Sequence, residues 1–108
     1  MARLEAEKCF VYCGVVDLRK GAPGLLALIG QTDAEVLYLF SNRMRSLLKF
    51  VAVDGSGVWC GTRRLHHGRF CWPTSLRSRE RLDAGELACL LMGGDLEKHR
   101  LRRTLSGH

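Results

Sequence analysis

The sequence predicts an α+β domain with a small antiparallel β-meander sheet of about four to five strands. One helix is expected after the first strand and one near the C-terminus. Three observations predict this class. A β-rich segment near the start is followed by a short apolar stretch with helix signals. Strand-like runs alternate with tight turns between residues 36 and 73, and a capped apolar stripe follows over 84–92.

The first strand is expected at Cys9–Cys13, where β-rich residues are closed by Gly14. Pro23 sits where the first turn of a helix tolerates proline, because the missing N–H would have no partner there. Leu25–Ile29 is then a short apolar helix that Gly30 ends.

The meander is the clearest part of the pattern. Val36–Phe40 is nearly all apolar, which predicts a central strand covered on both faces. Leu47–Val53 is a second strand, and the Asp54–Gly57 turn joins it to a return strand over Val58–Leu65.

Arg69–Trp72 predicts one more short strand, because aromatic residues favour extended backbone and Pro73 closes the run. Thr74–Arg81 is polar and rich in arginine, so it is expected to be a connection.

The late helix has an N-terminal signature. Asp83 is a plausible N-cap for a helix over Ala84–Met92, and Glu86 stands where a capping box requires a carboxylate. Residues 1–96 are therefore expected to form a single α+β domain. Residues 97–108 form a basic tail, for which a fraying helix and disorder both remain open.

Charge is distributed unevenly along the chain. The net charge is +6, yet nine basic residues and only two acidic ones fall between residues 36 and 81, a difference of seven. Eight of the nine are arginines, whose planar guanidinium suits phosphate. The nine are Arg43, Arg45, Lys49, Arg63, Arg64, Arg69, Arg77, Arg79 and Arg81.

These cations are expected to share one surface, because Lys49 and Arg63 lie on strands that one hairpin turn joins. A functional surface is favoured over a merely solvated sheet face. Aromatic residues are interleaved with the cations, and most of them are expected to be core. They are Phe50, Trp59, Phe70 and Trp72.

Neither catalysis nor metal binding is predicted. Five cysteines, an odd number without a dense framework, favour free buried thiols in a reducing compartment. No CxxC pair is present, and no local sequence arranges a nucleophile with a base. We therefore expect no enzyme, no cofactor, no metal site and no catalytic residues. The absence of an apolar N-terminal core or a membrane-length apolar run predicts a cytoplasmic protein.

Several motifs occur in an order and spacing that resemble the TnpB-type accessory protein of the insertion sequence 66 family of bacterial transposons, also called Orf2-like. The resemblance runs from about Cys13 to Leu96. It implies a role in DNA transposition beside a separate transposase that carries the catalytic carboxylates, and it offers no catalytic residues to carry over. The motifs are Asp17-Leu18-Arg19-Lys20-Gly21, Phe40-Ser41-Asn42-Arg43, Lys49, Asp54-Gly55-Ser56-Gly57, Arg64-Leu65 and Gly68-Arg69-Phe70-Cys71-Trp72-Pro73.

The leading hypothesis is an accessory protein that binds DNA without catalysis, largely through phosphates and with little sequence preference. The alternative is a protein-interaction module that docks on the transposase without binding DNA itself. DNA, the transposase and other proteins of the same element are thus the expected partners. The expected nucleic-acid-binding residues are Arg43, Arg45, Lys49, Arg63, Arg64 and Arg69, with Arg19 and Lys20 as a second patch.

Overall fold

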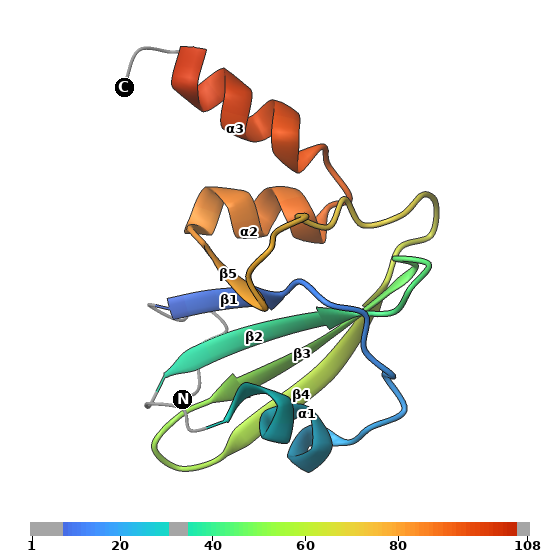
Figure 1. Cartoon of the computed structure of the whole chain (residues 1–108), viewed down its shortest axis with the longest axis vertical. Helices are drawn as coiled ribbons and strands as arrows, with labels where there is room; N and C mark the ends of the chain where they lie inside the picture. Colours follow the sequence, from blue (N-terminus) through green and yellow to red (C-terminus); the bar gives the residue numbers. More distant parts are fainter. Residues whose placement is uncertain (1–7, 31–34, 106–108) are drawn as a thin grey trace.

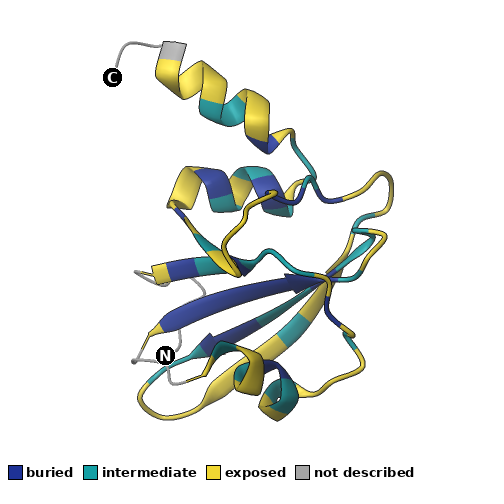
Figure 2. Cartoon of the chain, viewed as in Figure 1, coloured by how far each residue is buried: buried dark blue, intermediate teal, exposed yellow. Residues whose placement is uncertain are grey.

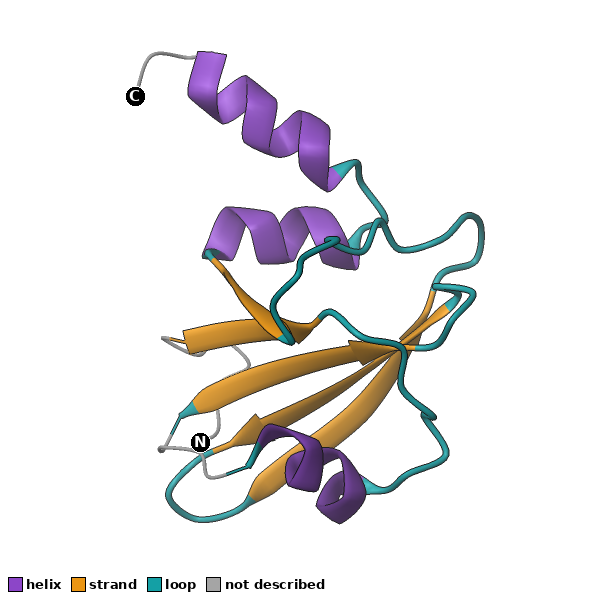
Figure 3. Cartoon of the chain, viewed as in Figure 1, coloured by secondary structure: helices purple, strands orange, loops and turns teal. Residues whose placement is uncertain are grey.

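A computed structural model of the chain describes residues 8–30 and 35–105 (Figure 1). Its strands and helices confirm the predicted α+β class, with one helix after the first strand and others near the C-terminus (Figure 3). In chain order they are β1 (Lys8–Tyr12), α1 (Ala22–Ile29), β2 (Val36–Ser41), β3 (Leu47–Val53), β4 (Val58–Arg64), β5 (Arg79–Leu82), α2 (Ala84–Leu91) and α3 (Leu96–Leu105).

The described strands form one five-stranded sheet in the order β4-β3-β2-β1-β5. Strand β2 is central, and all of its residues are buried, as the apolar run predicted. The sheet is mixed rather than purely antiparallel, because β1 and β2 run parallel. Parallel neighbours need a long crossover, and the segment containing α1 supplies it.

The fifth strand does not lie where the sequence placed it. Arg79–Leu82, expected to be part of a polar connection, forms β5 and pairs antiparallel with β1. Arg69–Trp72 is not a strand. That segment runs as a loop whose Phe70 and Trp72 are buried against the sheet. Burial of these two aromatic rings, rather than strand pairing, accounts for the apolar character of the segment.

The sheet has a core on each face. Helix α1 packs on one face, where Leu25 meets Tyr38, Phe40 and Val51. Helix α2 and the loop that contains Phe70 cover the other face. Figure 2 shows β2 as the buried centre between these layers, with exposure concentrated on β4 and the outer helices.

Local signals fix the helix and hairpin ends. Pro23 lies in the first turn of α1, and Gly30 ends this helix with a φ of 82°, a value that favours glycine. At α2, the Asp83 carboxylate accepts from the Glu86 N–H while the Glu86 carboxylate accepts from the Asp83 N–H, which is the expected capping box. Asp54 accepts hydrogen bonds from two N–H groups of the predicted hairpin turn.

Helix α3 extends through most of the segment for which helix and disorder were both open. Leu96 buries its side chain at the start of this helix. Further along, Arg100 donates to Glu80 at 2.6 Å and to Glu86 at 2.5 Å, and Arg103 pairs with Asp83. Because Glu86 is buried, its charge requires a cation nearby, and α3 supplies one.

Two side chains of β4 are more exposed than the rest of their kind. Most of the interleaved aromatics lie in or against the core, as expected, but Trp59 is 54% exposed on β4. Cys60, grouped with the buried thiols, is also exposed, although all five cysteines are free. Both residues lie on β4, which has a neighbour on one side only among the described strands, so less of each side chain is covered. Within residues 8–30 and 35–105, no helix combines the length and apolarity needed to cross a membrane.

Candidate functional site

The topology collects basic residues at one end of the sheet. Strands β1, β2 and β4 all end there, and β3 begins there. The strand ends and the adjoining segments at this end hold all eight residues expected to bind nucleic acid. We call this region the basic end; it comprises Arg19, Lys20, Arg43, Arg45, Lys49, Arg63, Arg64 and Arg69.

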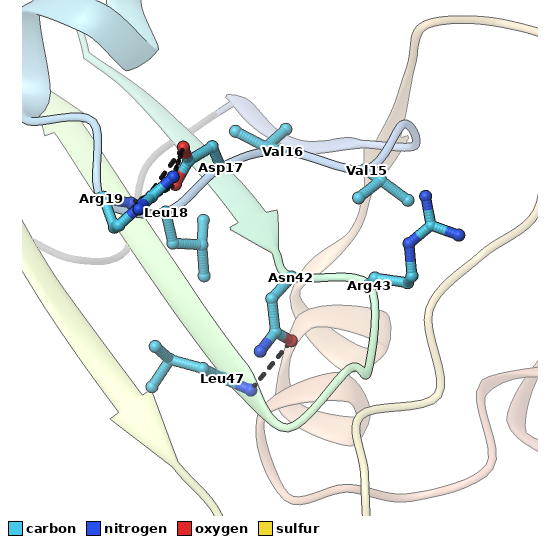
Figure 4. Close-up of a pocket in the computed structure, with 8 residues that line it drawn as sticks. All are labelled: Val15, Val16, Asp17, Leu18, Arg19, Asn42, Arg43 and Leu47. Carbon is cyan, nitrogen blue, oxygen red and sulfur yellow. Dashed lines mark hydrogen bonds and ion pairs between the residues drawn. The ribbon is translucent and has the colours of Figure 1, made fainter.

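A shallow, open groove of about 490 Å³ lies at the basic end. It runs between the segment that follows β1 and the turn between β2 and β3, so it joins two motifs that are far apart in the sequence. Figure 4 shows Arg19 and Arg43 on different segments of its lining. The lining residues are Val15, Val16, Asp17, Leu18, Arg19, Asn42, Arg43 and Leu47.

Asp17 and Arg19 form an ion pair in this lining (Figure 4). The Asp17 carboxylate accepts from the Arg19 N–H and Nε, each at 3.0 Å, and from Nη2 at 2.9 Å. The side-chain hydrogen bond from Arg19 is the main cause that lowers the pKa of Asp17 to about 2. The Arg19 side chain is nevertheless 91% exposed, so its guanidinium remains accessible to an anion.

Lys49 connects β3 to the segment before α1. Its Nζ donates to the Leu18 carbonyl oxygen at 3.0 Å and to the Lys20 carbonyl oxygen at 3.2 Å. These two bonds hold the turn on which Arg19 and Lys20 stand. Lys49 therefore has a structural role that its position in the sequence did not indicate.

Arg45 connects the β2–β3 turn to the loop that carries Phe70. Its φ of 56° is unusual for a residue other than glycine. This conformation is held on two sides. The Arg45 carbonyl oxygen accepts from the Phe70 N–H at 2.8 Å, and the guanidinium lies 5.3 Å from the centre of the Trp72 ring. Trp72 in turn donates its indole N–H to the Tyr12 carbonyl oxygen at 2.9 Å.

Arg63 and Arg64 do not share a face, because neighbouring residues of a strand point to opposite sides. Arg63 donates its Nε to the Leu91 carbonyl oxygen at 2.7 Å, at the C-terminus of α2. Lys49 points to the α1 side, so Lys49 and Arg63 lie on opposite faces of the sheet. The expected single sheet surface is therefore not formed. The cations share the end of the sheet instead.

Four cations of the basic end are exposed and have no ion pair or side-chain hydrogen bond to the described part of the chain. They come from three different segments: Lys20, Arg43, Arg64 and Arg69. Asp17 is the carboxylate in the groove lining, and Arg19 already neutralises it. The basic end therefore keeps a positive charge that the folded chain leaves uncompensated.

Sequence reasoning missed Asn42, which organises the turn beneath Arg43. Its Oδ1 accepts from the Ser46 N–H at 3.1 Å and the Leu47 N–H at 3.4 Å, and its amide donates to Ser46 at 3.0 Å. Asn42 belongs to the Phe40-Ser41-Asn42-Arg43 motif, and the preference of asparagine for turns indicates such a role.

The cysteines do not suggest a chemical site. Burial raises the pKa of the Cys9 thiol to about 12, so this side chain stays protonated at neutral pH. Among residues 8–30 and 35–105, no three side chains of histidine, cysteine, aspartate or glutamate gather as metal ligands would.

The chain is similar to known sequences over most of its length. Residues 7–101 match the family model described as IS66 Orf2 like protein. A curated relative is an uncharacterized protein, y4hO, from Sinorhizobium fredii (strain NBRC 101917 / NGR234). It is 32% identical over 94 residues, which cover 82% of this chain and 81% of the relative. No solved structure shows significant similarity. The resemblance seen in the motifs is thereby confirmed, and the chain belongs to the IS66 Orf2-like family, the TnpB-type proteins with an accessory role in transposition.

Proposed function

We propose that the basic end binds the phosphate backbone of DNA and that the protein acts in transposition by this contact, without catalysis. The observation that carries the proposal is the group of four exposed cations, from three segments, that have no carboxylate partner in the described chain. They are Lys20, Arg43, Arg64 and Arg69. A folded protein gains no internal stability from such a cluster, because its charges repel one another.

The frame beneath these cations supports the proposal. Lys49 fixes the turn that carries Lys20, Arg45 fixes the turn that carries Arg43, and Arg63 attaches the end of β4 to α2. Three basic residues therefore have their polar groups engaged inside the protein. The backbone segments that carry the exposed cations are therefore already ordered before an anion binds. This order lowers the conformational entropy that is lost on binding.

The groove suits a sugar-phosphate chain better than a small anion. Arg19 and Arg43 supply positive charge to its lining, while Val15 and Leu47 supply apolar surface. Phosphate oxygens would meet the guanidinium groups and the sugars would meet the apolar side chains. Such contacts carry little sequence information, so binding is expected at random DNA as well as at transposon ends.

The accessory role of the family in transposition supports the proposal, in which a separate transposase performs the chemistry. The proposal therefore assigns this chain a DNA-holding role in the cytosol, where the element and its transposase would meet.

A salt titration tests the proposal. Binding to labelled random and transposon-end DNA, duplex and single-stranded, would be measured by fluorescence anisotropy between low and moderate salt. If three or four phosphates are contacted, the slope of log K against log salt is about −3 on duplex DNA. Affinity should be similar for the random and end sequences. A protein that leaves both forms of DNA unbound at low salt would refute the proposal.

Docking on the transposase is the second candidate function, and the same exposed arginines favour it, because an acidic protein patch also binds guanidinium groups. Copurification of the two proteins distinguishes the candidates. A complex that survives high salt, from a chain that does not bind DNA alone, would favour docking.

A further inference from the structure

Strand β4 is an open edge of the sheet. It is seven residues long and pairs with β3 on one side, while no strand of the described chain pairs with its other side. The opposite edge, β5, has only four residues. A long edge presents backbone N–H and C=O groups that another strand can satisfy.

The exposed side chains of β4 divide it into two halves. Val58, 48% exposed, and Trp59, 54% exposed, make the first half apolar. Arg63 and Arg64 make the last half basic. Gly61 lies between the halves, four residues along from Gly57 in the hairpin turn. If two copies of β4 pair antiparallel, the apolar half of each copy therefore lies beside the basic half of the other.

We propose that two copies of this chain pair through β4, antiparallel, with the two-fold axis at Gly61. The two sheets then become continuous. Trp59 lies opposite Arg63 of the partner subunit, and Cys60 lies opposite Thr62 of the partner subunit. This inference goes beyond the proposed DNA contact, since it rests on the strand edge rather than on the groove; Arg64, which takes part in that contact, lies at the end of the same strand.

Charge favours antiparallel over parallel pairing. A parallel arrangement would set Arg63 against its own copy, and like charges directly opposite each other destabilise a sheet. Antiparallel pairing about Gly61 separates the two Arg63 positions by about 13 Å, four residues of strand. Each guanidinium instead meets an indole ring, which attracts cations. The Arg63 Nε bond to the Leu91 carbonyl oxygen already holds this side chain in place.

Gly61 permits the close approach that the axis requires. A Cβ atom built at Gly61 would lie 2.5 Å from the Phe50 ring of β3, so the ring occupies the space of the missing side chain. Phe50 is only partly buried in the single chain. In the pair, two glycines face each other with a Phe50 ring beside each, so apolar surface that is open in the monomer becomes covered.

A cysteine introduced opposite Cys60 tests both the pairing and its register. Thr62→Cys places a second thiol across the axis from Cys60, where the Cα atoms of directly opposed strand residues lie about 4.5–5.5 Å apart, a separation that a disulfide can span. The matched control is Thr62→Cys combined with Cys60→Ser, which leaves one thiol opposite a hydroxyl. Mild oxidation, non-reducing electrophoresis and mass spectrometry of the linked peptides would identify the bond.

The expected result is a covalent dimer of Thr62→Cys, linked to Cys60, and none above background in the control or in the unmodified chain. A dimer linked through two copies of Cys60 would overturn the register, and no dimer in Thr62→Cys would overturn the pairing.

Sedimentation equilibrium of the unmodified chain gives a second test. It should show a monomer–dimer equilibrium that Trp59→Lys weakens at least tenfold, because lysine would then face arginine. Circular dichroism would check that this exposed substitution leaves the fold intact. A chain that remains monomeric at high concentration would also overturn the pairing.

Discussion

Arginines gather in two regions of this molecule, and their surroundings differ. At the junction of α2 and α3, Arg100 lies between Glu80 and Glu86, and Arg103 pairs with Asp83. At the basic end, Arg43, Arg64 and Arg69 are exposed without a carboxylate partner in the described chain. In the first region carboxylates of the same chain neutralise the arginines, while in the second the arginines remain exposed to solvent.

This difference shows that a count of basic residues does not identify a binding surface. The tail after Leu96 is more basic for its length than the middle of the chain, yet part of its charge holds α3 against β5 and α2. Even within the basic end, Lys49 and Arg63 donate to backbone carbonyl oxygens. Substitutions can therefore distinguish cations that stabilise the fold, whose loss lowers stability, from cations that are available to a ligand, whose loss lowers affinity.

The largest expected effect is on stability, at the α2–α3 junction. Arg100→Met leaves the buried Glu86 carboxylate without its main cation and should lower the free energy of unfolding by about 2–3 kcal/mol. Urea denaturation followed by circular dichroism measures this loss. The matched control is Lys98→Met, on an exposed position of the same helix, and it should cost less than about 0.5 kcal/mol.

The double substitution Arg100→Met with Glu86→Gln sharpens this result. The neutral amide keeps an oxygen for the capping bond to Asp83 and removes the stranded charge. It should therefore recover part of the lost stability. If Arg100→Met is no more destabilising than Lys98→Met, the charges at the junction do not hold α3 in place.

A smaller loss is expected at Lys49. Lys49→Met removes two hydrogen bonds from its ammonium group to the carbonyl oxygens of Leu18 and Lys20, and should cost about 1–2 kcal/mol. Thermal unfolding measures the cost. Lys20→Met is the control, since this exposed side chain should matter to DNA affinity and hardly to stability. Equal stability losses in the two variants would show that Lys49 does not support the turn.

Asp17→Asn tests the comparison in the opposite direction, because it removes the carboxylate from the groove. Arg19 would then contribute its full charge, so DNA affinity should rise several-fold at low salt. The magnitude of the salt slope should grow by at most about one, the contribution of one further phosphate contact. Anisotropy titrations would detect both changes. Weaker binding by this variant would indicate that the carboxylate itself is needed.

The smallest expected effect is the titration of Asp17. Its pKa is about 2 in the fold, below its ordinary value of 3.8, chiefly because Arg19 donates to it. The associated stabilisation is present above pH 3.8 and is lost as the pH falls through about 2. Arg19→Ala should raise the pKa toward 3.8, as carbon-detected NMR of the carboxyl group would show. An unchanged pKa would assign the shift to another group.

Much of the fold could be predicted because its signals are local. The capping box of Asp83 and Glu86, the hairpin turn at Asp54 and the buried run of β2 all depend on residues within a few positions of one another. The parallel pairing of β1 with β2 and the position of β5 could not be predicted, since both depend on contacts between distant segments.

The candidate site divides in the same way. Sequence reasoning found the cluster of cations, because arginine content is visible directly. It could not assign their roles. The bonds from Lys49 to Leu18 and from Arg63 to Leu91 span 31 and 28 residues along the chain. Nor could it find that Trp59 is exposed, because an apolar residue on an edge strand resembles one in the core.

The most direct test compares two triple variants that remove equal charge. Arg43→Gln, Arg64→Gln and Arg69→Gln remove three exposed cations of the basic end. Lys8→Gln, Arg77→Gln and Lys98→Gln remove three exposed cations from elsewhere. Both sets should leave stability nearly unchanged. Only the first should reduce the magnitude of the DNA salt slope, by about two to three. Equal reductions in the two variants would contradict a local DNA-binding surface at the basic end.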